Sequence, residues 1–350
     1  MKDIVLASPV ILPISSDKLI NCAIAISKGK IVDIDQTKKI KSKFPNFEFI
    51  SKRNSIILPG FINAHTHLEL GWIKSKIKNF SSFIAWLEQI ILVKSEKIPD
   101  SEIKNSVING IKDLIYSGVT TVGEISSYDG LDIDILKNSG LRTVLFKEIV
   151  DSKIQSLNSM HFEKEDLYEE RPFPHAPYSC SPKLLEDVFN ISYKEDIPLA
   201  IHLAESGDEV NFLKNKKNGF EEIIFPLIEK ENFKRETSAS PAKYIASYLK
   251  DRKIKLSAVH MIQIDEEDID LINNYDISII LCPRSNILLK VGKPKLELIK
   301  NLKRVGLGTD GLSSNHDLNF FEELREINKI FVEKKIRNNS FLSIYLATLG

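Results

Sequence analysis

The sequence has few cysteines, no excess charge and no long apolar run, and each absence excludes a class of protein. Three cysteines, Cys22, Cys180 and Cys282, occur among 350 residues. An odd number without a Cys-x-x-Cys pair argues against a secreted disulfide framework and favours a reducing cytoplasm. Lys plus Arg and Asp plus Glu both number 48, so no net positive charge attracts nucleic acid or an anionic membrane. The expected partner is therefore a small molecule.

The N-terminal stretch is apolar but is interrupted by Asp3, Pro9 and Pro13. No uncharged apolar run reaches the roughly 18 residues that a membrane span needs. The sequence therefore predicts neither a signal peptide nor a membrane span, and the expected location is cytoplasmic.

Two kinds of pattern divide the chain. Residues 1–55 contain short strand-like segments, at 3–14, 19–34 and 47–57, which predict a small β module. From residue 56 to residue 350 strands and helices alternate, as in parallel βα units. The expected strands of this part cover residues 56–64, 119–125, 141–150, 172–176, 198–204, 255–261, 277–282 and 305–309.

Eight βα units in series predict a closed barrel. The expected fold class is α/β, with a (β/α)8 TIM-like barrel and a small β-sandwich module from the N-terminus. The active site of such a barrel lies at the C-terminal ends of its strands. Residues at those ends are therefore the candidates for chemistry.

His65 and His67 stand at the end of the first barrel strand, separated by one residue. Side chains alternate across a strand, so residues i and i+2 point the same way and both imidazoles can reach one metal ion. The same spacing also occurs by chance on exposed strands. Further ligands elsewhere in the chain decide between the two interpretations.

Five of the seven histidines fall at expected strand ends, which a random distribution would not produce. His161 lies in a polar run and is expected at the surface. His316 is expected either to contact the substrate or to be exposed to solvent. The strand-end residues are His65, His67, His175, His202, His260 and Asp310.

Three imidazoles and one carboxylate, from His65, His67, His202 and Asp310, suit one divalent ion with an open position for water. Zinc is the first expectation and ferrous iron the alternative. Glu205, three residues after His202, is placed to move the water's proton, although a helix N-terminus is the common position for such a Glu. His260 is either a further ligand or the group that holds the hydroxide and the developing oxyanion.

Five segments resemble the amidohydrolase superfamily, in the branch of nucleoside-type deaminases and chlorohydrolases, in order and spacing. They are residues 58–67 (LPGFINAHTH), 175–181 (HAPYSCS), 202–205 (HLAE), 282–286 (CPRSN) and 308–315 (GTDGLSSN).

The resemblance implies one metal ion, held by the four residues above, because binuclear members carry a lysine where this chain has His175. It also implies that Glu205 is the proton shuttle, that His260 orients the nucleophile and that His175 contacts the substrate.

Other substrate contacts are expected near the site. The helix bearing Trp86 offers an apolar wall, and the ribose-binding glutamate of related deaminases aligns with Ser95 or Glu96. Asn286 and Ser314 are available as hydrogen-bond donors, with loop capping as an equal alternative.

The leading functional hypothesis is hydrolytic deamination of an amino-purine nucleoside. Glu69, two residues after the histidine pair, resembles the pattern of aminodeoxyfutalosine deaminases, so 6-amino-6-deoxyfutalosine is the first expected substrate. The alternatives are methylthioadenosine or adenosylhomocysteine deamination, a chlorohydrolase or guanine-type reaction, and a degenerate barrel that only binds a ligand.

Relatives extend beyond the point at which this sequence ends, returning to complete the β-sandwich. We therefore expect the module formed by residues 1–55 to lack its C-terminal part. The sequence leaves open whether the protein is a homo-oligomer.

Overall fold

The computed structural model of the chain describes residues 2–151, 157, 160–230, 233, 236–250, 252–299, 302 and 304–350. Two compact units are present, residues 1–60 with Leu349 and residues 61–348 with Gly350. None of the described helices is both long and apolar enough to cross a membrane.

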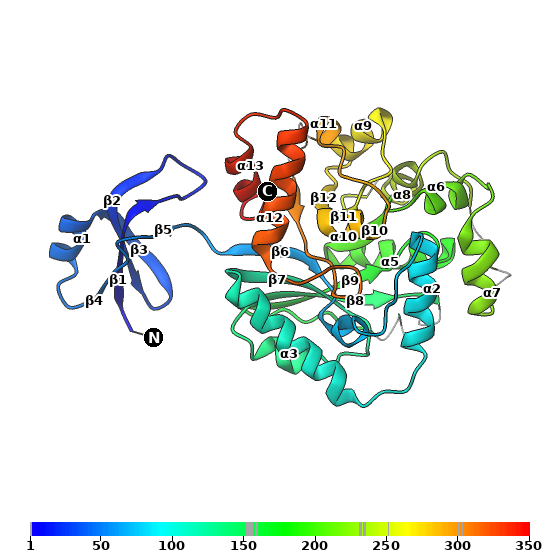
Figure 1. Ribbon diagram of the computed structural model, residues 1–350, viewed down its shortest axis with the longest axis horizontal. Helices are drawn as coiled ribbons and strands as arrows, with labels where there is room; N and C mark the ends of the chain where they lie inside the picture. The colour runs from blue at the N-terminus through cyan, green and yellow to red at the C-terminus, as the bar shows by residue number, and fades with distance from the viewer. Residues whose placement is uncertain are drawn as a thin grey trace. The chain divides into compact units, whose positions relative to one another are not determined.

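The described residues of the first unit form one sheet and one short helix, which Figure 1 displays. Strand order is β3-β2-β1-β4, with β5 also paired to β1. One core is formed by Val5, Ala7, Ala23, Ala25 and Ile40. That this unit is part of a sandwich stays a prediction. Its elements are β1 (Ile4–Ile11), β2 (Leu19–Ser27), β3 (Lys30–Gln36), α1 (Thr37–Lys43), β4 (Glu48–Ser51) and β5 (Ile56–Ile57).

The second unit carries two parallel four-stranded sheets, in the orders β6-β7-β8-β9 and β10-β11-β12-β13. Each of the eight strands expected beyond residue 56 has a counterpart here. The strands are β6 (Phe61–Thr66), β7 (Val119–Ser126), β8 (Arg142–Ile149), β9 (Tyr168–Pro174), β10 (Leu199–Leu203), β11 (Leu256–His260), β12 (Ser278–Leu281) and β13 (Val305–Leu307).

Hydrogen bonds link the two sheets at their edges. The His202 amide donates to the His175 carbonyl at 3.0 Å, and the Asp310 amide donates to the His65 carbonyl at 3.1 Å. The arrangement is TIM-barrel-like with mixed α and β content, and complete closure of the barrel stays a prediction. These links join the segments on which the candidate site residues stand.

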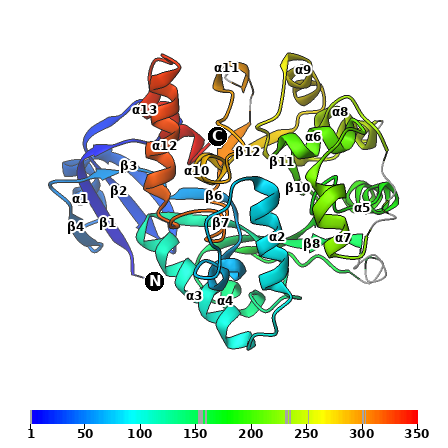
Figure 2. The same ribbon diagram turned by 45° about the vertical axis from the view of Figure 1, so that its right-hand side comes forward.

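Helices fill most of the connections between these strands (Figures 1 and 2). Several begin at a Ser or Asp whose side chain accepts an amide of the first turn, as Ser181 does from Leu184 at 3.3 Å. The helices are η1 (Leu68–Ile73), α2 (Phe83–Lys94), α3 (Asp100–Tyr116), α4 (Ile133–Lys137), α5 (Pro182–Glu195), α6 (Gly207–Leu213), η3 (Phe220–Ile224), α7 (Phe225–Leu227), α8 (Pro241–Leu249), α9 (Glu266–Asn274), α10 (Pro283–Leu288), α11 (Leu296–Ile299), α12 (Phe320–Glu333) and α13 (Asn339–Leu346).

Two local expectations differ from the structure. The segment expected as one strand over 56–64 is divided into β5 and β6, because Pro59 has no N–H for a ladder and Gly60 adds conformational freedom. Helix α1 was not expected, since residues 37–43 contain a single buried apolar residue, Ile40.

Strand side chains pack together inside the second unit. Ile125, Phe146, Phe173, Ala200, Val259, Ile280 and Cys282 form one buried cluster. These residues come from six successive strands or from the residue directly after one. The core therefore holds the strand ends at fixed distances, which positions the residues that follow each end.

Candidate active site

Three histidine side chains from two strands converge at the C-terminal ends of the sheets. His202 Nε2 lies 3.3 Å from His65 Nε2 and 3.4 Å from His67 Nε2. All three residues are buried. Donors about 2.1 Å from one ion at tetrahedral angles lie about 3.4 Å from one another. The spacing of the three nitrogens therefore fits ligands of a single ion.

Asp310 supplies an oxygen to the same point. Its Oδ1 lies 3.5 Å from the Nε2 atoms of both His65 and His67. Its Oδ2 accepts hydrogen bonds from Ser285 Oγ at 2.6 Å and from Ser314 Oγ at 2.7 Å. The two hydroxyls fix the carboxylate so that one oxygen faces the histidines. The residues present thus fit a divalent ion, with three nitrogens and one oxygen as donors.

The protonation states also favour ligation. Burial, and next the neighbouring His65, lower the pKa of His67 to about 3. Burial and then the surrounding histidines hold the pKa of His202 well below its usual range. Burial would raise the pKa of Asp310, but the histidines around it keep that pKa well below its ordinary value. Neutral imidazoles and an ionised carboxylate are the forms that bind metal ions.

Glycine is required where the last strand passes the first. A Cβ at Gly308 would lie 2.7 Å from the His65 carbonyl oxygen, and a Cβ at Gly311 would lie 2.9 Å from His67 Cβ. Any side chain at these positions would push the loop that carries Asp310 away from the histidines. The sequence GTDG thus permits the close approach that completes the donor set.

The backbone is strained at three of the strand ends. Ala204, His260 and Asp310 have φ values of 52°, 79° and 56°, in the left-handed region that residues other than glycine rarely adopt. Such conformations cost about 1–3 kcal/mol each and cluster at functional sites. His260 and Asp310 are themselves candidate site residues, and Ala204 directly precedes Glu205.

Glu205 and His260 form a pair beside the donor set. Glu205 Oε1 lies 3.6 Å from His260 Nε2, and both side chains are buried. Burial, followed by the charges of Asp310 and Glu209, raises the pKa of Glu205 well above its ordinary value. A carboxyl in this environment readily holds a proton, as a general acid and base must.

Glu209 fixes the turn that carries Glu205. Its two carboxylate oxygens accept the amides of Ala204 and Glu205, both at 2.9 Å. Asn286 in α10 holds His260 in a similar way, through a 3.0 Å hydrogen bond between Nδ2 and the imidazole Nδ1. With Nδ1 accepting, His260 carries its proton on Nε2, which faces Glu205.

His175 lies one residue beyond β9, beside the histidine cluster. Its ring centroid is 4.9 Å from that of His202, and its Nδ1 is 2.7 Å from Ser179 Oγ. Nε2 lies 4.0 Å from Glu148 Oε1. The ring also lines a cavity of about 420 Å³, which lies next to the donor set.

The other residues predicted to contact the substrate interact with different parts of the protein. Trp86 donates its indole N–H to the Ser313 carbonyl at 2.8 Å, so it holds the loop after Asp310. Glu96 is half exposed and forms an ion pair with Lys76, and the structure does not bring it to the histidines. Asn286 and Ser314 lie in the site, but each holds another site residue. Their substrate contacts stay predictions.

Two residues that position the candidate site residues were not predicted from the sequence. Ser285 precedes Asn286 in the CPRSN segment, and Glu209 follows Glu205 by four residues. The available signals were a hydroxyl next to a candidate donor and a Glu in the first turn of a helix. Both are common features, so only the contacts with Asp310 and with the turn after β10 reveal their roles.

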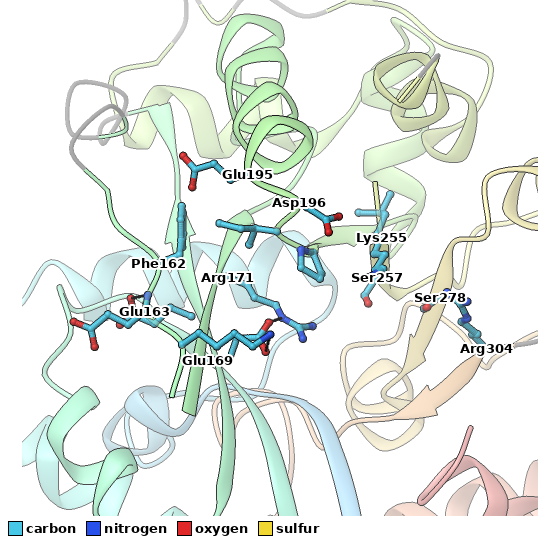
Figure 3. A pocket seen from close by; sticks show the side chains of 15 residues that line it. Phe162, Glu163, Glu169, Arg171, Glu195, Asp196, Lys255, Ser257, Ser278 and Arg304 are labelled. Atoms are coloured by element: carbon cyan, nitrogen blue, oxygen red, sulfur yellow. Dashed lines mark hydrogen bonds and ion pairs between the residues drawn. The ribbon is translucent and has the colours of Figure 1, made fainter. Parts of the chain in front are cut away.

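A larger cavity of about 670 Å³ lies at the other ends of the strands (Figure 3). Its lining includes Arg171 in β9, Ser257 in β11, Ser278 in β12 and Arg304 just before β13. Several charges there pair with one another, such as Arg171 with Glu169 at 2.8 Å. None of the candidate metal-type donors is among the lining residues of this larger cavity.

Parallel strands with histidines and an aspartate at their C-terminal ends, beside an acid–base pair, are typical of metal-dependent hydrolases with a barrel-like fold. Residues 56–348 match the model of the amidohydrolase family, and the chain belongs to this family. The family resemblance of the sequence motifs is confirmed.

Individual relatives are deaminases. An aminodeoxyfutalosine deaminase from a Nitratiruptor species is 32% identical over 316 residues, 87% of this chain and 75% of that protein. A 5-methylthioadenosine/S-adenosylhomocysteine deaminase from Carboxydothermus hydrogenoformans is 26% identical, over 86% of this chain and 67% of that protein.

One solved structure extends the similarity to the fold of nearly the whole chain. Helicobacter pylori aminofutalosine deaminase, in complex with methylthio-coformycin, superposes with a TM-score of 0.82 at 25% identity. The superposition covers 99% of this chain and 85% of that one.

Proposed function

We propose that the protein is a metal-dependent hydrolytic deaminase of an amino-purine nucleoside, with 6-amino-6-deoxyfutalosine as the first substrate. The observation that carries the proposal is the four-donor set of His65, His67, His202 and Asp310 beside the Glu205–His260 pair. The first relative named above supports the choice of substrate.

The four donors would hold a divalent ion, for which we propose zinc, and the ion would supply near neutral pH a water able to attack the ring carbon that bears the amine. Glu205 takes the water's proton and delivers it to the ring nitrogen next to that carbon. A C–O bond forms at that carbon, and Glu205 then takes the proton of the added hydroxyl and passes it to the exocyclic nitrogen, so that the bond to this nitrogen breaks and ammonia leaves. Water and the aminated ring thus give the oxo ring and ammonia.

His260 holds the nucleophile in this scheme. Its Nε2 proton points toward Glu205 because Asn286 occupies Nδ1, so the imidazole can donate to an oxygen between the two side chains. A donor placed before the reaction stabilises the charge that develops on that oxygen. We assign substrate contact to His175, which lines the adjoining cavity.

Ammonia release from a panel of substrates tests the proposal. With zinc-loaded protein, 6-amino-6-deoxyfutalosine should react faster than adenosylhomocysteine, and both far faster than guanine or a chlorinated triazine. Elemental analysis should give about one zinc per chain. Preference for guanine or the triazine would overturn the nucleoside assignment. No turnover of any panel member by metal-loaded protein would favour a barrel that only binds a ligand.

A further inference from the structure

A buried glutamate of helix α12 connects two segments that contact Asp310. Glu323 stands in the first turn of α12, which is orange-red in Figure 1. Its side chain is completely shielded from solvent. Burying a carboxylate is costly unless hydrogen bonds and a nearby positive charge satisfy it. The partners of Glu323 therefore indicate what this burial serves.

One part of the carboxylate reaches the beginning of α10. Glu323 Oε2 accepts the backbone amide of Arg284 at 3.3 Å, and Glu323 Oε1 lies 3.6 Å from Arg284 Nη1. Amides in the first turn of a helix have no acceptor within that helix, so Glu323 supplies one. The next residue is Ser285, which donates its hydroxyl to Asp310 Oδ2 at 2.6 Å. Glu323 thus fixes the helix start that carries one partner of Asp310.

The other contact of the carboxylate reaches the loop after β13. Glu323 Oε1 accepts Asn315 Nδ2 at 2.8 Å, and the same Nδ2 donates to the Thr309 carbonyl at 2.7 Å. Thr309 directly precedes Asp310 in the sequence. Asn315 directly follows Ser314, whose hydroxyl donates to Asp310 Oδ2 at 2.7 Å. Glu323 thus also holds the segment that carries the second partner of Asp310.

We propose that Glu323 is a positioning residue for the metal ion. It fixes the two segments whose hydroxyls, from Ser285 and Ser314, orient the Asp310 carboxylate toward the histidines. Among the described residues its hydrogen-bond and ion-pair partners are Arg284 and Asn315, so it acts on the donor set through its neighbours. The inference rests on the proposed metal-dependent function.

The test measures the zinc affinity of the zinc-loaded protein by competition with a chelator. Glu323→Gln keeps the size of the side chain but replaces one accepting oxygen with an N–H donor. The affinity should fall by about 10-fold, the lower end of the range for loss of groups that orient a metal ligand. Glu323→Ala removes both acceptors and should lose at least as much affinity. If Glu323→Ala does not fold, Glu323→Gln decides alone.

A double-mutant cycle distinguishes positioning from a general structural role. In the background Ser285→Ala, Ser314→Ala, the hydroxyls through which Glu323 acts are already absent. Adding Glu323→Gln to that background should therefore change the zinc affinity by less than about twofold, because residues that act through one another are not additive. A purely structural role would instead add its full effect.

Ile327→Ala is the matched control. Ile327 lies four residues after Glu323 on α12 and is equally buried. Its truncation removes packing from the same helix but leaves the acceptor oxygens of Glu323 in place. Urea denaturation should show a loss of stability, while the zinc affinity should stay within about twofold of wild type.

Three results would each overturn this inference while the deaminase function stands. They are wild-type zinc affinity in Glu323→Gln, the full loss of affinity when Glu323→Gln is added to the serine variant, and an equal loss in Ile327→Ala. A wild-type protein that binds no zinc and releases no ammonia from any aminated nucleoside would overturn the proposed function, and this inference with it.

Discussion

The two ends of the same parallel strands differ in how their charged groups are satisfied. At the C-terminal ends, His65 Nε2 lies 3.3 Å from His202 Nε2 and 3.5 Å from Asp310 Oδ1. At the N-terminal ends, Arg171 pairs with Glu169, which also faces Lys164 at 3.3 Å (Figure 3). One end holds donors arranged for a ligand, and the other holds charges that neutralise one another.

Strand β9 connects the ion-paired end of the strands to the candidate site within a few residues. Arg171 in its middle belongs to the paired network, while His175, one residue past its end, belongs to the site. The size of a cavity therefore does not indicate where the candidate site lies, since the larger cavity lies at the N-terminal strand ends, where charged groups pair with one another. In TIM-barrel folds the loops after the strands carry function and the opposite face carries stability, and the TIM-barrel-like arrangement here shows the same division of charged groups.

The largest effect is expected from removal of a metal-type donor. His202→Ala and Asp310→Asn should each lose bound metal and abolish turnover, because three remaining donors do not replace the fourth. Metal content by elemental analysis and ammonia release check this. His161→Ala changes an exposed histidine and should keep both. Full zinc in both donor variants would contradict the assignment.

Glu205→Gln should slow turnover by at least about 100-fold and leave metal and fold intact, because it removes the proton carrier but keeps the size of the side chain. Steady-state kinetics and metal analysis of the same sample separate the two effects. A wild-type rate would mean that Glu205 only stabilises the turn after β10.

The double variant Ser285→Ala, Ser314→Ala should weaken metal affinity by about 10-fold to 100-fold. Both hydroxyls orient the Asp310 carboxylate, and loss of such partners typically has this effect. Competition with a chelator measures the affinity. Ser313→Ala is the control, because Ser313 meets Trp86 through its backbone carbonyl rather than its hydroxyl. Equal affinity in both proteins would show that Asp310 needs no such support.

The smallest effect is expected at the opposite end of the strands. Arg171→Met removes a partly exposed ion pair with Glu169, so the free energy of unfolding should fall by at most about 1 kcal/mol. The kcat/KM value should stay within about twofold of wild type. Urea denaturation and the ammonia assay check both quantities. A large loss of activity with unchanged stability would break the contrast between the two ends.

Much of the fold and the donor set follows from local sequence. Apolar runs such as 199–203 and 256–260 bury both faces of a parallel strand, so they predict strands without knowledge of their neighbours. The period of two along a strand places His65 and His67 on one side. The order of the βα units then brings His202 and Asp310 to the same end. The division into a module of residues 1–55 and a barrel stays a proposal.

The sequence by itself determined the alternation of strands and helices and the family, and it predicted the metal-type donors, because these depend on local sterics and on residue type. The tertiary structure decided which ordinary residues serve the site. Ser285 donates a hydrogen bond to Asp310, which lies 25 positions later in the sequence, and Glu96 forms an ion pair with Lys76. Lys94 lines one cavity together with residues of the 224–228 segment. Such contacts depend on how elements far apart in the sequence pack against one another, and a local sequence pattern carries no information about that packing.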